Sequence, residues 1–300
     1  MKYFSMFSGI GGFGYGIEQI TKEWECIGYS EIDKYASSIY RLHYPDHKAY
    51  GDANEINPRQ LPDFDLLVGG FPCQAFSIAG KRRGFEDTRG TLFFEIARVL
   101  VEKRPRYFLL ENVKGLLSHS KGQTFQTILG VLSDIGYDYQ WQVLNSKDFG
   151  VPQNRERVFI VGHIRGECRP EVFPIGSVCE QDNKPNNGGV RLIQDKRQSG
   201  ETRLWENNSP AVTSYWGLGG GNVPYVGSNI YGVAINQFIR RLTPIECERL
   251  QAFPDCWTQF GVDVNGNLIE ISDTQRYKCL GNAVTTNVIT AIMERLYDRP

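Results

Sequence analysis

Apolar residues follow two different spacings along the first half of the chain and again near its end. Short apolar runs predict strands at 2–7, 25–30, near 49, and at 65–68, 107–110, 137–145 and 158–163. Between them, apolar positions at helical spacing predict helices at 34–44, 90–102 and 125–135, and a last helix that ends at 297. Strands that alternate with helices are typical of a mostly parallel, doubly wound sheet. The pattern therefore predicts an α/β fold.

Residues 165–240 have a different character. Up to Arg203 the segment is charged and rich in loops, whereas from Leu204 to Ile239 the only charged side chain is Glu206. This second half carries many aromatic residues, which a flexible linker does not need. We therefore expect a smaller, irregular, β-rich domain here that presents loops.

A helix start follows this region. Thr243 is a good N-terminal cap, Pro244 suits the first helical position, and Glu246 completes a capping box. The three residues predict a helix that begins at 244.

Composition narrows the class of protein. The chain has 300 residues, 41% of them hydrophobic and 22% charged, as in ordinary soluble proteins. It has no long apolar run and no signal-peptide pattern at its amino terminus, so we expect a cytoplasmic protein without a membrane span. Seven cysteines without Cys-x-x-Cys spacing argue against a disulfide framework and against a metal site. A net charge of −1 does not by itself indicate a nucleic-acid partner.

A glycine-rich turn follows the first predicted strand. Glycines at 9, 11, 12 and 14 separate this strand from a helical pattern, and such a turn lets backbone amides approach a nucleoside cofactor. Glu31 ends the second strand about twenty residues further on, where a ribose-binding carboxylate belongs. A tight turn that binds nothing is the simpler interpretation of the glycines alone.

A cysteine lies just beyond the strand at 65–68. Ligands bind outside the carboxyl ends of strands in open α/β sheets, and Cys73 occupies such a position. The glycines before it and Pro72 favour a sharply bent loop that presents the thiol outward. Most unpaired cysteines are instead small buried hydrophobes, and the spacing alone does not decide between the two.

Three charged residues follow or enter other strands. Glu111 comes directly after an apolar strand, where a carboxylate is either a helix cap or a functional group. Arg155 and Arg157 occupy alternate positions at the entry to a strand, which predicts that both point to one face.

Taken in order, these segments resemble the cytosine-C5 DNA methyltransferases of the bacterial and phage type. The matching motifs are the Phe7–Gly14 turn, Pro72-Cys73-Gln74, Glu111-Asn112-Val113, Gln153-x-Arg155-x-Arg157, the helix start at Thr243, and Gly281-Asn282-Ala283-Val284. The resemblance implies a Rossmann-like, S-adenosylmethionine-dependent methyltransferase fold with a smaller β-rich target-recognition domain. The catalytic domain would comprise 1–165 and 282–300, and the recognition domain with its hinge 166–281.

The resemblance also implies roles for the residues. Cys73 would add to carbon 6 of a cytosine, Glu111 would hold or donate a proton at its third nitrogen, and Arg157 would contact its carbonyl oxygen. Arg157, with Arg155, would supply positive charge that favours the thiolate. The S-adenosylmethionine site would include Phe7, Ser8, Gly9, Ile10, Gly11, Gly12, Glu31, Ile32, Asp52, Ala53, Pro72, Leu92, Asn282 and Val284.

Double-stranded DNA is the expected substrate. We expect the protein to be a monomer, with a companion restriction endonuclease in some settings. The candidate DNA-binding residues are Gln74, Ser77, Lys81, Arg82, Arg83, Arg191, Arg197, Arg203, Tyr215 and Trp216. Three other functions remain open at this point: an RNA cytosine methyltransferase on the same scaffold, an NAD-linked oxidoreductase, and a DNA-binding relative without activity.

Overall fold

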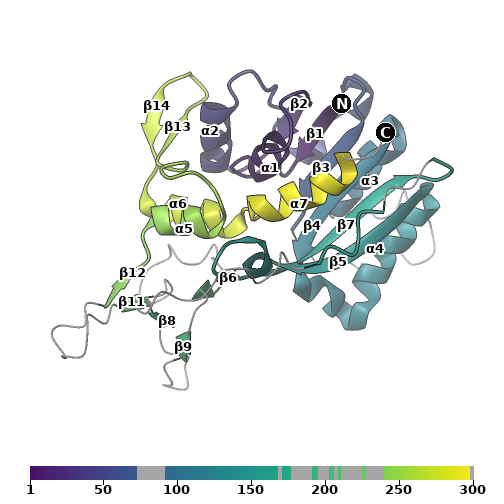
Figure 1. Cartoon of the computed structure of the whole chain (residues 1–300). Helices are drawn as coiled ribbons and strands as arrows, with labels where there is room; N and C mark the ends of the chain where they lie inside the picture. Colours follow the sequence, from purple (N-terminus) through teal and green to yellow (C-terminus); the bar gives the residue numbers. More distant parts are fainter. Residues whose placement is uncertain are drawn as a thin grey trace.

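A six-stranded sheet forms the centre of the molecule (Figure 1). The computed structural model describes residues 1–72, 92–167, 171–176 and 242–297, and the backbone of five short strands between 191 and 241. The strand order is β2-β1-β3-β4-β7-β5. These strands are β1 (Lys2–Met6), β2 (Glu25–Ser30), β3 (Leu66–Gly70), β4 (Tyr107–Val113), β5 (Tyr137–Asn145) and β7 (Glu156–Ile164).

The sheet is mostly parallel, with one reversed strand. β2, β1, β3 and β4 run parallel to one another, and β7 is antiparallel to both of its neighbours, β4 and β5. The reversal has a simple cause, because a parallel connection needs about a dozen or more residues and usually a helix. Only residues 146–155 join β5 to β7, and they form the 3₁₀ turn η7 (Ser146–Phe149) and the short strand β6 (Gln153–Asn154). The strand predicted near 49 is a single bridge between Tyr29 and Ala49.

Helices cover both faces of the sheet. Strand residues such as Phe4, Leu67 and Phe108 pack under α3 (Leu92–Lys103) and α4 (Gln123–Asp134). Their chain neighbours Tyr3, Leu66, Val68 and Leu109 pack under α1 (Gly12–Glu18) and α7 (Thr286–Tyr297) on the other face. Successive side chains of a strand point to opposite faces, so one continuous apolar run serves two cores. This is the doubly wound arrangement that the sequence predicts.

A third core joins the amino-terminal part of the chain to residues 242–283. It packs α2 (Lys34–His43) against α5 (Pro244–Leu250) and α6 (Asp273–Asn282). The hairpin β13 (Phe260–Val262) and β14 (Leu268–Glu270) also lies against α2. The capping box at Thr243 is confirmed, whereas α6 and this hairpin were not predicted. The division at 166–281 stays a prediction, but its last part shares a core with α2.

The segment before α5 contains short strands, as expected of a β-rich region. An antiparallel sheet of order β12-β11-β8-β9 joins β8 (Arg191–Gln194), β9 (Arg203–Trp205), β11 (Tyr225–Gly227) and β12 (Ile239–Arg241). β10 (Ser209–Pro210) pairs with β6 of the first region.

Among the described helices, none has the length and apolarity needed to cross a bilayer. Shorter 3₁₀ turns are η1 (Ala53–Glu55), η2 (Pro58–Gln60), η5 (Lys114–Leu117) and η6 (His119–Gly122).

Close packing of α1 on α7 gives a first prediction. A Cβ added at Gly16 would lie 2.7 Å from Cβ of Ile289 and 3.0 Å from the carbonyl oxygen of Thr286. Gly16→Ala should therefore lower the free energy of unfolding in urea by about 1–3 kcal/mol, the usual cost of overpacking. The matched control is Gly130→Ala in α4, where an added Cβ meets nothing within 4 Å. That variant should gain about 0.5–1 kcal/mol, because alanine favours helix over glycine. Equal effects of the two changes would contradict the packing account.

Candidate active site

The loops of the candidate site meet at one edge of the sheet. The parallel strands β1, β2, β3 and β4 all end at this edge, and the antiparallel strand β7 begins there. The chain leaves β1 toward β2 on one side and later adds β3 and β4 on the other, which makes this edge a topological switch point. Such a switch point opens a crevice for ligands between the two sets of loops.

The first loop is a turn in an unusual backbone conformation. Phe7, Gly9 and Gly11 have φ angles of 53°, 55° and 92°, in the left-handed region that costs a side-chain-bearing residue about 1–2 kcal/mol. Hydrogen bonds from Ser8 hold the turn: its Oγ donates to the carbonyl oxygens of Ser5 and Ser30, each at 3.1 Å. The amide of Gly11 donates back to the carbonyl of Ser8 at 3.0 Å. The turn thus keeps its strained shape through bonds to β1 and β2.

Glu31 connects this turn to the start of α2. Its Oε2 accepts a hydrogen bond from the Gly9 amide at 2.8 Å, and its Oε1 accepts one from the Asp33 amide at 2.7 Å. Burial raises the pKa of Glu31, while the two amide hydrogen bonds oppose that change. Asp33 caps α2 and forms an ion pair with Lys278 of α6 at 2.6 Å. The carboxylate of Glu31 is therefore held in one orientation beside the turn.

Open space and an exposed apolar side chain lie next to this carboxylate. Added Cβ atoms at Gly9 and Gly51 would meet nothing within 4 Å, and Ile32 is 75% exposed. By contrast, Cβ atoms at Gly11 and Gly12 would each lie 2.7 Å from a protein side chain, that of Tyr44 and of Val284 respectively. A fixed carboxylate beside an apolar side chain suits the hydroxyls and the flat base of a nucleoside. The carboxylate of Glu31 and the side chain of Ile32 therefore fit the adenosine part of S-adenosylmethionine.

The other residues predicted for this cofactor occupy varied positions. Asp52 caps η1 by accepting a hydrogen bond from the Asn54 amide at 2.9 Å. Ala53 and Val284 are buried in the core, and Leu92 is the first residue of α3. Pro72 and Asn282 are exposed. Of these six residues, Pro72, Leu92, Asp52 and Asn282 have side chains that are open to a bound molecule, whereas Ala53 and Val284 do not.

A buried ion pair occupies the opposite part of the same edge. Val113 lies opposite Arg157 in the β4–β7 ladder, so Arg157 is the diagonal neighbour of Glu111 on one face. Nε of Arg157 lies 3.1 Å from Oε1 of Glu111, and both side chains are largely buried. Burial raises the pKa of Glu111, although Arg157 and Arg155 oppose the shift, and burial lowers the pKa of Arg157. Oε2 of Glu111 reaches over Gly70 at the end of β3.

Arg155 has different partners from Arg157, although the sequence predicts one shared face. It lies in the turn before β7, where its amide donates to Asn145 Oδ1 at 3.0 Å. Its buried guanidinium donates through Nη2 to the carbonyls of Gly281 and Ala283 at 3.0 and 2.7 Å. Arg155 thereby connects the sheet edge to the loop between α6 and α7.

Asn112 was not assigned a role from sequence, although it belongs to the Glu-Asn-Val motif. The side chain is buried, and its Nδ2 donates a hydrogen bond of 2.8 Å to the carbonyl oxygen of Phe71. Phe71 and Pro72 lead directly to Cys73. Asn112 thus fixes the backbone of Phe71, two residues before Cys73 in the sequence.

Several predicted residues lie outside the part of the chain that the structure describes. They are Cys73, Gln74, Ser77, Lys81, Arg82, Arg83, Arg197, Tyr215 and Trp216. Arg191 and Arg203 begin β8 and β9, of which the structure describes the backbone only. Their roles stay predictions.

Two solved structures share this fold over almost the whole chain. The chain matches a DNMT2 mutant from Spodoptera frugiperda with a TM-score of 0.67 and 19% identity, over 99% of each chain. It matches Dnmt2 methyltransferase from S. pombe with a TM-score of 0.69 and 18% identity, over 98% of this chain and 97% of that one. At this level of identity the likeness establishes the fold, which is the Rossmann-like methyltransferase fold.

Sequence comparison identifies the family. The model of the C-5 cytosine-specific DNA methylase family matches residues 1–215 and 177–298. Type II methyltransferase M1.ScrFI of Lactococcus lactis subsp. cremoris is 39% identical over 99% of this chain and 78% of its own length. Type II methyltransferase M.HhaI of Haemophilus parahaemolyticus is 32% identical over 97% and 93%. The chain belongs to the C-5 cytosine-specific DNA methylase family, and it is an enzyme of that class.

Burial of Glu111 generates a prediction about stability and pH. Below the ordinary pKa of 4.5 both the folded and the unfolded chain carry this carboxyl protonated. Above 4.5 the unfolded chain ionises freely, whereas the folded chain retains the proton until the raised pKa is passed. The stability that the protonated Glu111 contributes is therefore lost as the pH rises through its raised pKa. Each unit of pKa shift corresponds to about 1.4 kcal/mol in the free energy of unfolding.

Glu111→Gln removes this pH dependence. The free energy of unfolding of the variant, relative to the unchanged protein, should therefore increase between about pH 5 and about pH 8. Urea titrations of both proteins at three pH values measure the difference. A difference that stays constant or becomes smaller with rising pH would show that the carboxyl is not held in its neutral form.

Proposed function

We propose that this chain transfers a methyl group from S-adenosylmethionine to carbon 5 of a cytosine in duplex DNA, through a covalent bond to Cys73. The observation that supports this proposal most directly is the buried Glu111–Arg157 pair. Asn112, the residue after Glu111, is hydrogen-bonded to Phe71, two residues before Cys73. The ion pair shares one sheet edge with the turn and carboxylate that suit a nucleoside. An NAD-linked oxidoreductase would leave the ion pair and the cysteine without a role.

The cysteine supplies the activation that the reaction needs. Carbon 5 of cytosine is a weak nucleophile, so an addition to carbon 6 must come first. The thiolate of Cys73 forms a bond to carbon 6, and the ring becomes an enamine that is nucleophilic at carbon 5. When bound, S-adenosylmethionine supplies the electrophilic methyl group that carbon 5 takes. Loss of the carbon 5 proton then expels Cys73 and restores the aromatic ring.

Glu111 assists this addition by protonating the ring. Electron density that arrives at carbon 6 spreads to the third nitrogen, where a carboxylic acid can donate a proton. Burial raises the pKa of Glu111, so this carboxyl retains its proton to a higher pH than an exposed glutamic acid does. The conjugate carboxylate left after donation lies 3.1 Å from Nε of Arg157, which stabilises it.

Arg157 and Arg155 have separate tasks in this proposal. A guanidinium has five N–H donors, more than Glu111 and the carbonyl of Glu156 require, so Arg157 can also donate to the cytosine carbonyl oxygen. Arg155 holds the loop that contains Asn282 and contributes positive charge to the pocket. Both charges favour the thiolate form of Cys73 over the thiol.

The cofactor site completes the assembly. Glu31 would bind the ribose hydroxyls, Ile32 would pack against the adenine, and the turn from Phe7 to Gly12 would approach the methionine part. Pro72, Leu92, Asp52 and Asn282 would line the same site. These assignments rest on the fixed carboxylate, the open space at Gly9 and the exposed Ile32.

Duplex DNA must give up the target base before this chemistry can occur. Extrusion of a base costs a few kcal/mol and allows the pocket to contact its edge. The candidate groups for DNA are the residues from Gln74 to Arg83, together with the polar and aromatic loops of the β-rich region. We propose that the protein acts as a cytoplasmic monomer, with a companion restriction endonuclease in some settings.

The nucleophile is tested by a pair of cysteine variants. Cys73→Ala should abolish transfer of labelled methyl groups to duplex DNA while DNA binding stays within about threefold, since the thiol acts in chemistry. The matched control is Cys256→Ser, because Cys256 is an exposed thiol of the same chain. Transfer RNA serves as the competing substrate. Residual turnover by Cys73→Ala, or methylation of transfer RNA in place of DNA, would overturn the proposal.

Glu111→Gln tests the proton donor. The amide keeps the size of the side chain but cannot donate an acidic proton, so kcat should fall about 10²- to 10⁴-fold. The affinity for DNA should change little, because the variant leaves the cofactor turn and the arginines in place. Single-turnover methylation at saturating cofactor measures the rate. An unchanged rate would exclude Glu111 from the chemical step.

A further inference from the structure

A tryptophan far along the chain holds the outer side of the cofactor turn. The indole Nε1 of Trp257 donates a hydrogen bond of 3.0 Å to the carbonyl oxygen of Ile10, and the bond is buried. Ile10 lies between the two left-handed glycines of the turn, Gly9 and Gly11. The bond therefore joins the carboxy-terminal third of the chain to the middle of the turn.

This bond fixes the orientation of one peptide plane. A peptide unit is planar, so the carbonyl of Ile10 and the amide of Gly11 turn together. The Gly11 amide donates to the carbonyl of Ser8, and the Gly9 amide donates to Glu31. Contacts from Ser8 and Glu31 hold the turn from the side of β1 and β2, whereas Trp257 holds it from the side of α5. Removal of either restraint lets the strained backbone relax.

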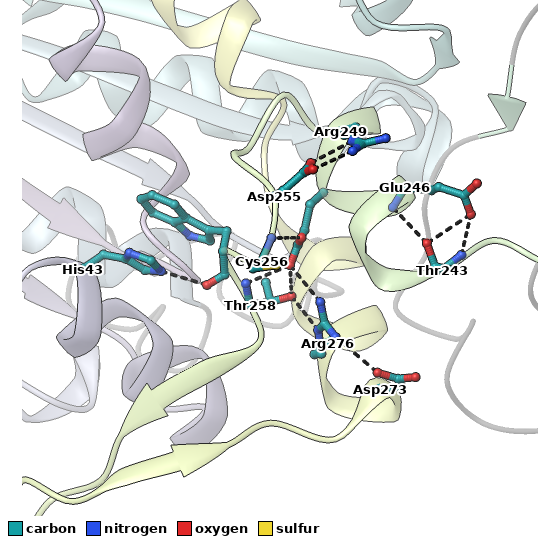
Figure 2. Close-up of polar contacts among 11 residues, drawn as sticks. His43, Thr243, Glu246, Arg249, Asp255, Cys256, Thr258, Asp273 and Arg276 are labelled. Carbon is teal, nitrogen blue, oxygen red and sulfur yellow. Dashed lines mark hydrogen bonds and ion pairs between the residues drawn. The ribbon is translucent and has the colours of Figure 1, made fainter.

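Trp257 itself is held in place by α2. Its ring stacks on the ring of His43 with a centroid distance of 3.5 Å and an interplanar angle of 6°. Nε2 of His43 also donates to the carbonyl oxygen of Trp257 at 2.8 Å (Figure 2). The ring of Tyr15 of α1 also contacts the ring of Trp257, in an edge-to-face arrangement with a centroid distance of 5.0 Å. Ring and backbone of Trp257 are thus fixed separately.

A buried carboxylate fixes the segment that carries Trp257. Cys256 has a left-handed φ of 65°, and the Glu248 carboxylate accepts hydrogen bonds from the amides of Cys256 and Thr258, each at 2.8 Å. Glu248 is fully buried and pairs with Arg276 of α6 at 3.2 Å, and Arg276 also donates to Thr258 Oγ1 (Figure 2). Removal of one partner from a buried charge pair is costly, so this shape is maintained firmly.

We propose that Trp257 is a positioning residue for the cofactor turn, and that the Glu248–Arg276 pair acts through it. The inference rests on the proposed use of this turn for S-adenosylmethionine. The indole N–H holds the Ile10–Gly11 peptide in the orientation that the bound cofactor requires. Its loss therefore weakens cofactor binding while the chemistry at Cys73 continues.

The test is Trp257→Phe, which keeps an aromatic ring and removes the N–H donor. In this variant the buried carbonyl of Ile10 loses its hydrogen-bond donor, which raises the free energy of the turn conformation that binds the cofactor. The Kd for S-adenosylmethionine should therefore rise about fivefold or more. KM for the cofactor should rise in parallel, whereas kcat at saturating cofactor and the KM for DNA should stay within about twofold. Calorimetry with S-adenosylmethionine and steady-state methylation of DNA supply these values.

Tyr277→Phe is the matched control. It removes a hydrogen bond of 2.5 Å to the carbonyl of Leu242 within the same carboxy-terminal segment, and this bond does not involve the turn. Its thermal stability should fall and its cofactor Kd should stay unchanged. If Tyr277→Phe raises the Kd as much as Trp257→Phe does, or if Trp257→Phe binds as tightly as the unchanged protein, the inference is wrong.

A second variant covers the case in which Trp257→Phe does not fold. His43→Leu leaves the indole in the chain but removes the stack and the bond to the Trp257 carbonyl, so the cofactor Kd should rise about two- to threefold. An unchanged Kd in that variant would also overturn the inference. If the protein without substitutions binds the cofactor and methylates DNA, the proposed function holds whatever the variants show. If it does neither, both proposals are wrong.

Discussion

The common direction of β1, β2, β3 and β4 is the constraint on which the site depends. Because these strands end at one edge, residues that are far apart in sequence meet without long loops. The reversed strand β7 begins at the same edge, and this places Arg157 beside Glu111. Two cores pack the faces of the sheet behind this edge and keep the strand ends from shifting. The proposed chemistry would therefore be carried by short segments on a rigid support.

Buried charge is the second feature of the site. Glu111 and the two arginines are placed where water does not screen them, so each strongly affects the protonation of the others. Such an arrangement is poor for stability, because ion pairs of this kind seldom offset their desolvation. Under the proposed function, a carboxyl with a raised pKa and fixed cations would both act on one base. Asn112 adds a neutral anchor that holds the backbone of Phe71 at the end of β3.

Much of this arrangement was accessible from sequence, because it depends on local signals. The strands, the glycine turn, Glu31 and the capping box at Thr243 follow from periodicity and from residues with specific backbone preferences. The direction of the strand at 158–163 depends on the short connection from β5 to β7, and the apolar pattern does not indicate strand direction. The partners of Arg155 and Trp257 lie more than a hundred residues away and depend on tertiary packing. A single sequence carries no local signal for such pairs.

Covalent capture of the target base tests the account most directly. Duplexes in which every cytosine is replaced by 5-fluorocytosine need no knowledge of the recognised sequence, and fluorine at carbon 5 prevents the final elimination. In the presence of S-adenosylmethionine, the protein should become irreversibly joined to such DNA, and peptide mapping should find the adduct on Cys73. Without the cofactor the stable product should be absent. An adduct on another residue, or none at all from protein that binds both ligands, would contradict the account.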